Sequence, residues 1–162
     1  MEYFKLFKRL FEERVRYLIC GGLAVNIYGI PRMTMDIDLL LDFEEENIKS
    51  FNKAVEDLSY KPSVPISLQS LLDEEIRRKM IQEKNLIAYS YYNGESNFIS
   101  LDVLIDTPIS FKTMWERKEV RNAYDSKVYI VSLEDLISLK TYANRNQDKQ
   151  DVILLSRLMQ LS

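Results

Sequence analysis

The spacing of apolar residues over the first forty positions predicts two helices and two strands. Between residues 3 and 15 the apolar positions recur every three or four residues with charged residues between them, which is typical of an amphipathic helix. The short apolar run over 16–20 predicts a buried strand that stops at a Gly-Gly pair, and 23–28 then predicts a brief helix. Residues 33–41 alternate between polar and apolar, and this alternation predicts a second strand.

The remainder of the chain predicts further strands and helices without a repeat or a linker. We expect helices over 44–58, 67–83, 110–118, 133–143 and 147–161, and strands over 86–92, 97–105 and 127–131. Residues 60–65 predict a proline-bearing connector, and 93–96 a hairpin-like turn. The pattern favours one domain over 1–162, with the helices of 133–161 packed on its core. The predicted class is α+β, a mixed β-sheet with helices packed mainly on one face.

The composition narrows the available chemistry. The 162 residues include no histidine and a single cysteine, which excludes histidine-dependent catalysis and thiolate zinc sites. Carboxylates, Lys, Arg, hydroxyls and a cation that prefers oxygen ligands remain. A net charge of −3 gives no overall basic field for a long duplex nucleic acid. The sequence shows neither a membrane-spanning apolar run nor a signal peptide, so we expect a cytoplasmic protein.

Gly21 and Gly22 end the first strand just before a helix. Glycines let the backbone approach a phosphate closely, and the start of a helix offers free N–H groups to an anion. A plain turn is the alternative for such a pair.

Two aspartates in the second predicted strand make a metal–phosphate site more specific. Asp36 and Asp38 are two positions apart, so both carboxylates project from one face while Ile37 and Leu39 face the core. Two adjacent like charges repel each other unless a cation joins them, and Mg²⁺ binds one or two protein carboxylates together with substrate phosphates. A solvated strand edge carrying two aspartates is the alternative.

A third acid lies inside an apolar strand. Asp102 is flanked by Leu101 and Val103, and an unpaired buried carboxylate is costly, so a metal shared with the first two acids would explain it. An exposed strand face or a salt bridge is the alternative. Asp106 competes for the same role, but it stands at the strand end beside Thr107-Pro108, where a turn residue is expected.

The Gly-Gly turn, the Asp-x-Asp pair and the later acid occur in the order found in the nucleotidyltransferase superfamily, which includes DNA polymerase β, and the sequence resembles that superfamily. Residues 17–41 are similar to a small prokaryotic branch that includes AbiEii-type toxins. In that branch an Arg-x-Thr precedes the acidic pair, as Arg32 and Thr34 do here. These two residues either contact phosphate or order the loop.

The resemblance implies transfer of a nucleoside monophosphate from a triphosphate such as ATP to an acceptor hydroxyl on a small molecule, a protein or a tRNA. Asp36, Asp38 and Asp102 would be the catalytic residues and would hold two Mg²⁺ ions, for which Mn²⁺ can substitute. The alternative is a nucleotide-binding member of a toxin–antitoxin system with little catalysis. Whether a partner protein or a second copy completes the site stays open.

The C-terminal segment also resembles the toxin branch, in which a Lys on one helix and an Asp that opens the next line the nucleotide site. By matching position, Lys140 would contact the phosphate or the base, with Asp148 nearby and Arg145 assisting. Ordinary helix residues are the alternative. Tyr89, Tyr91 and Tyr92 cluster in one predicted strand, where we expect packing rather than base stacking.

Overall fold

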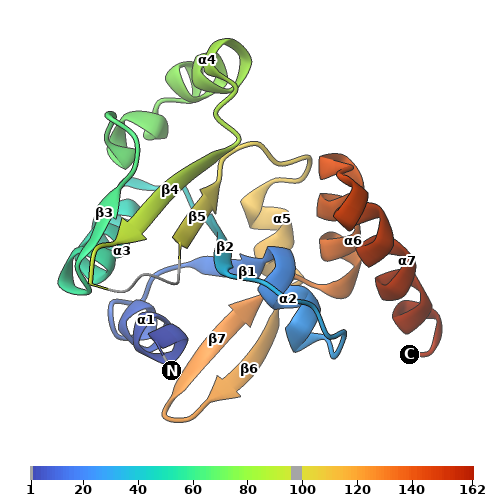
Figure 1. The fold of residues 1–162 in the computed structure, drawn as a ribbon. Helices are drawn as coiled ribbons and strands as arrows, with labels where there is room; N and C mark the ends of the chain where they lie inside the picture. The colour runs from blue at the N-terminus through green and yellow to red at the C-terminus, as the bar shows by residue number, and fades with distance from the viewer. Residues whose placement is uncertain (1, 96–99) are drawn as a thin grey trace.

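A computed structural model describes residues 2–95 and 100–162, and in these residues the strands form one mixed sheet. The strands lie in the order β3-β4-β5-β2-β1-β7-β6 (Figure 1). β2 pairs in parallel with β5, β1 pairs in parallel with β7, and the other neighbours are antiparallel. The strands are β1 (Tyr17–Cys20), β2 (Asp36–Leu41), β3 (Tyr60–Pro62), β4 (Ala88–Asn93), β5 (Ser100–Leu104), β6 (Glu119–Ala123) and β7 (Ser126–Ile130).

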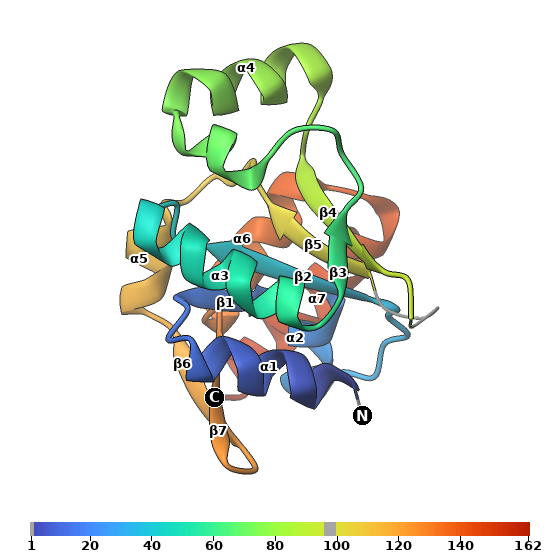
Figure 2. The same ribbon diagram turned by 90° about the vertical axis from the view of Figure 1, so that its left-hand side faces the viewer.

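Helices lie on both sides of this sheet, and α4 stands apart from it. α1 and α3 lie side by side across one face, whereas α6 and α7 lie behind the sheet in the same view (Figure 2). The predicted α+β class with a mixed sheet is confirmed, but the helices cover both faces of the sheet and not mainly one, because α6 and α7 pack on the face opposite to α1 and α3. The helical elements are α1 (Glu2–Glu12), α2 (Gly21–Ile27), α3 (Glu45–Asp57), the 3₁₀ helix η1 (Leu68–Leu72), α4 (Glu74–Lys84), α5 (Phe111–Glu116), α6 (Leu133–Ala143) and α7 (Asn146–Gln160).

The alternation in β2 separates the core from the polar face of the sheet. Ile37, Leu39 and Leu41 are buried, as their spacing predicted, and belong to the same core as Leu10 of α1 and Phe51 of α3. Burial of each such side chain contributes about 1.5–3 kcal/mol. The opposite face of β2 is thereby left for the aspartates. No helix in the described residues is long and apolar enough to cross a membrane.

Several predicted boundaries are wrong for local reasons. The helix expected over 67–83 is interrupted at Asp73, which has an extended backbone and whose side-chain Oδ1 caps α4 by accepting a hydrogen bond from the Ile76 amide. The connector expected over 60–65 contains the edge strand β3, and β6 was not predicted because three of its five residues are polar or charged. Residues 33–35 precede the strand that was expected to include them. The part of the expected strand over 97–99 lies outside the described residues.

Candidate nucleotide site

The Gly-Gly turn is shaped by the side chains packed against it. Gly21 has a φ of +62°, and a Cβ added there would lie 1.8 Å from Oδ2 of Asp38. A Cβ added to Gly22 would lie 2.8 Å from Oγ1 of Thr34. Because L-residues with a side chain rarely adopt this φ and the space is taken, only glycine fits at position 21 without a shift. The turn therefore lets the Asp38 carboxylate lie directly against the end of β1.

The strand register brings two of the predicted acids together. Asp38 pairs with Asp102 across the parallel β2–β5 ladder, with Cys20 on its other side in β1. Side chains paired across adjacent strands lie on the same face of a sheet. Asp36 pairs with Ser100, whose hydroxyl donates to its Oδ1 at 2.5 Å. The three acids thus occupy one face, and Asp38 and Asp102 are direct neighbours.

The environment of Asp38 and Asp102 disfavours their charged forms. Burial raises the pKa of Asp38, and the nearby Asp102 and Asp36 raise it further, against the lowering effect of Lys140 and Arg145. Burial also raises the pKa of Asp102, partly opposed by a hydrogen bond from Ser90. A bound cation would favour both carboxylates in their charged form.

The donor chemistry and the register of these acids fit Mg²⁺, which takes carboxylate oxygens and completes its shell with water and phosphate. Among residues 2–95 and 100–162, no group of three or more acidic, histidine or cysteine side chains is placed so that it could hold a metal ion together. Asp36 accepts the hydrogen bond from Ser100 through Oδ1, and its Oδ2 lies outside that hydrogen bond.

A cavity of about 470 Å³ opens beside Asp38 and Asp102. One wall is acidic and the other combines the apolar side chains of α6 with two cations, Lys140 and Arg145. At its edge the Tyr142 hydroxyl donates to Asp106 at 2.9 Å. The lining residues are Cys20, Gly21, Asp38, Ile87, Ala88, Asp102, Leu104, Asp106, Leu136, Leu139, Lys140, Tyr142, Ala143, Arg145 and Asp148.

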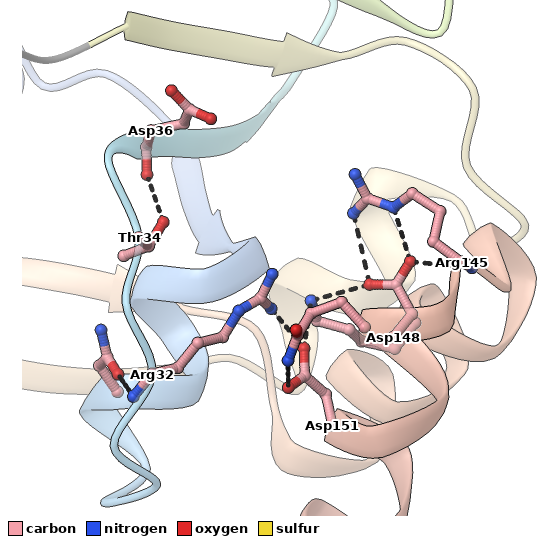
Figure 3. A network of polar contacts seen from close by, with 9 residues as sticks. Arg32, Thr34, Asp36, Arg145, Asp148 and Asp151 are labelled. Atoms are coloured by element: carbon pink, nitrogen blue, oxygen red, sulfur yellow. Dashed lines mark hydrogen bonds and ion pairs between the residues drawn. The ribbon is translucent and has the colours of Figure 1, made fainter.

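The cations of the cavity are held by acids of α7. The Lys140 side chain is 4% exposed, and its Nζ lies 3.0 Å from Oδ1 of Asp148 and 2.9 Å from Oδ2 of Asp151. The Arg145 side chain is 73% exposed, and its Nε donates to Oδ2 of Asp148 at 2.7 Å (Figure 3). Burial alone would raise the pKa of Asp148, but the hydrogen bonds from Arg145 and Lys140 outweigh it and lower that pKa.

Arg32 and Thr34 belong to the loop that leads into β2. Arg32 donates through Nη1 to Asp151, and its backbone amide donates to the Asn26 side chain at 2.7 Å. Thr34 donates to the backbone oxygen of Asp36 at 3.2 Å (Figure 3). The hydrogen bonds and the ion pair of Arg32 and Thr34 thus order the loop before β2. The lining residues in the described ranges do not include Arg32, Thr34, Asp36 or Gly22.

Asp151 was not among the residues predicted from the sequence for the site. Two acids three positions apart at the start of a helix are normally explained by the helix dipole, so the sequence pattern gave no reason to select it. Its burial, 2% exposed, separates it from an ordinary helix-start acid.

A glycine turn joined to a strand with paired aspartates, with a third acid beside them in a parallel strand, defines a nucleotidyltransferase fold. Solved structures of this fold are similar to the chain. The lincomycin-bound lincosamide antibiotic adenylyltransferase LnuA aligns with a TM-score of 0.61 and 17% identity over 97% of this chain and 96% of its own. ANT(2")-Ia in complex with adenylyl-2"-tobramycin aligns with a TM-score of 0.59 and 13% identity, over 98% of this chain and 87% of its own.

A nucleotidyltransferase-like protein from Paracoccidioides brasiliensis is also similar, with a TM-score of 0.55 and 17% identity over 97% of this chain and 77% of its own. The family described as "Nucleotidyl transferase AbiEii toxin, Type IV TA system" has a sequence model that matches residues 6–153. The chain belongs to this nucleotidyltransferase family. A search of curated proteins gave no match.

Proposed function

We propose that the protein is a metal-dependent nucleotidyltransferase that moves a nucleoside monophosphate from a nucleoside triphosphate to an acceptor hydroxyl. The observation that supports this most is the pairing of Asp38 with Asp102 on adjacent parallel strands, both with raised pKa values. They border a cavity that also contains Lys140 and Arg145. A metal–triphosphate requires carboxylates that a metal ion stabilises in their charged form, next to basic side chains that bind phosphate oxygens.

In this proposal Asp36, Asp38 and Asp102 hold Mg²⁺, two ions when the site is full, and Mn²⁺ can replace it. The bound metal supplies positive charge to the phosphates and to the acceptor oxygen. Gly21 leaves room for Asp38 at the turn. Lys140 and the exposed Arg145 bind phosphate oxygens, with Asp148 holding both cations in place.

The transfer step then uses residues already adjacent to one another. The acceptor oxygen bonds to the α-phosphorus, the bond from the α-phosphorus to the bridging oxygen breaks, and pyrophosphate leaves. The acceptor proton passes to the carboxylate of Asp102, which lines the cavity next to Asp38. Positioning and charge provide most of the acceleration in such a step, so the lack of histidine in the sequence is no obstacle.

The family description places its members in type IV toxin–antitoxin systems, and we propose that this chain acts in such a system in the cytoplasm. Its nucleotide is a triphosphate such as ATP, and the acceptor is a small molecule, a protein or a tRNA. The alternative is a protein that binds nucleotide with little turnover and works through a partner protein or a second copy.

Incubation with each α-labelled triphosphate and Mg²⁺, in the presence of tRNA, protein and small hydroxyl acceptors, tests the proposal. The wild type should transfer label, whereas Asp38→Asn and Asp102→Asn should not. Asp125→Asn is the matched control, since this exposed aspartate lies in the β6–β7 turn and pairs with Lys8. Metal-dependent nucleotide binding without transfer would favour the alternative, and a folded protein that neither binds nor transfers would overturn both.

A further inference from the structure

Asp151 is a buried acid that joins two separate parts of the site. Its side chain is 3% exposed and accepts from Lys140 of α6 at 2.9 Å and from Arg32 of the loop before β2. Gln147 adds a longer contact at 3.4 Å. Figure 3 shows Arg32 reaching across from the loop toward α7, where Asp148 and Asp151 lie. One carboxylate therefore connects the segment that follows the glycine turn with the buried ammonium of the cavity.

Burying the Lys140–Asp151–Arg32 ion pairs costs more desolvation free energy than an apolar packing contact would. Taking charges out of water is expensive, and apolar side chains of similar volume often give equal or greater stability. Lys140 has three N–H donors, of which Asp148 and Asp151 accept two, so one remains for a ligand in the cavity that Lys140 lines. Asp148 also accepts from Arg145 and Asp151 from Arg32, so two carboxylates serve three cations, and loss of Asp151 would leave Lys140 only the carboxylate that it shares with Arg145.

The loop end of the connection lies beside the glycine turn. The Arg32 guanidinium carbon would be 3.5 Å from a Cβ added to Gly22, and Thr34 lies against the same glycine. The ion pair that holds Arg32 in place therefore also holds the side chains that pack against Gly22. Because Asp38 lies against Gly21, a displaced turn would move the acids relative to Lys140.

We infer that Asp151 is a positioning residue, which holds Lys140 and the Arg32 loop at a fixed separation so that the triphosphate meets the ammonium and the acids together. This inference rests on the proposed function and assigns Asp151 a role that acts through Lys140 and Arg32. Among the described residues, Asp151 is not one of those that line the cavity. Its loss should weaken binding of the triphosphate more than it slows the chemical step, because the Lys140–phosphate contact is made in both the ground and transition states.

Steady-state kinetics of Asp151→Asn, Arg32→Gln and the double variant test the inference, with Asp125→Asn as the control. Loss of a charge-assisted hydrogen bond should raise the KM for the triphosphate about tenfold in either single variant, with kcat changed by no more than about twofold. If both residues act through one connection, the KM of the double variant should be no higher than that of the single variant with the higher KM. Arg32→Lys should recover most of the KM, because it keeps a charged donor.

A second readout does not depend on turnover. Amine acylation followed by mass spectrometry should modify Lys140 slowly in the wild type, since the side chain is 4% exposed, and faster in both single variants. An unchanged KM in a folded variant, multiplication of the two single effects, or unchanged acylation of Lys140 would overturn the inference. If Asp151→Asn does not fold, Arg32→Gln decides by the same criteria. If the wild type transfers nothing, the proposed function has failed, and the acylation rates alone decide the role of Asp151.

Discussion

Replacement of Gly21 by alanine would place a methyl group where the Asp38 carboxylate lies. The added Cβ would be 1.8 Å from Oδ2, 2.6 Å from Cγ and 2.7 Å from Cβ of Asp38. Real Cβ atoms do not approach so closely, so the Asp38 side chain or the backbone of the turn must move. Asp38 is also the acid whose register pairs it with Asp102, so its displacement should separate the two acids.

The magnitude follows from two separate contributions. A left-handed conformation costs a non-glycine residue about 1–2 kcal/mol, and forcing extra volume into a packed site costs about 1–3 kcal/mol. We therefore expect Gly21→Ala to lower the free energy of unfolding by about 3 kcal/mol. For a chain of this length that corresponds to a fall in Tm of roughly 6–12 °C. Transfer of labelled nucleotide should fall below detection.

Two other glycines separate these contributions. Gly29 has a φ of +94° with nothing within 4 Å of an added Cβ, so Gly29→Ala carries the conformational penalty alone. Gly94 also has open space around it and no positive φ, so Gly94→Ala should be close to neutral. Thermal and urea unfolding of the three variants should rank the loss of stability as Gly94 below Gly29 below Gly21.

The reasoning fails if Gly21→Ala destabilises the protein no more than Gly29→Ala does. It also fails if Gly21→Ala loses as much stability in an Asp38→Ala background as in the wild type. In that background the carboxylate atoms at 1.8 and 2.6 Å are gone, so part of the loss should be recovered.

Three further changes test the charges. The raised pKa of Asp38 means that its ionisation costs stability as the pH rises from about 4 through the raised value, so Asp38→Asn in EDTA should exceed the wild type in Tm at neutral pH. This advantage should disappear below about pH 4, and a constant advantage would contradict it. Arg117→Met leaves the buried Asp135 without the partner at 2.5 Å and should lower the free energy of unfolding by roughly 2 kcal/mol in urea; no loss would argue against the pairing. Arg145→Met should change that free energy by less than about 1 kcal/mol, because the side chain is 73% exposed. Calorimetry should nevertheless show weaker binding of Mg²⁺–triphosphate, and equal binding would remove Arg145 from the site.

The sequence alone could predict which face of the sheet each β2 side chain points to, because successive side chains in a strand alternate between the two faces. Asp36 and Asp38 are placed on one face and Ile37 and Leu39 in the core by this rule. The pairing of Asp38 with Asp102 could not be derived in the same way, since the two residues are joined by long-range strand pairing whose register no local pattern specifies.

Other features depended on contacts that the sequence does not reveal. β6 has one strongly apolar residue, Val120, and it is a strand because β7 provides its hydrogen-bonding partner. Asp151 looks like a helix-start acid until the fold brings Arg32 and Lys140 to it from other elements. Tyr89 and Tyr91 pack in the core as predicted, but the neighbouring Tyr92 is 49% exposed.

The central claim is that Asp38 and Asp102 jointly bind a divalent cation that carries the triphosphate. The most direct test is a crystal of the protein soaked with Mn²⁺ and a non-hydrolysable triphosphate, in which anomalous scattering locates the metal. We predict an anomalous peak within ligand distance of carboxylate oxygens from both aspartates, with the phosphates extending toward Lys140 and Arg145. Nucleotide bound with its metal away from these two aspartates would contradict the account.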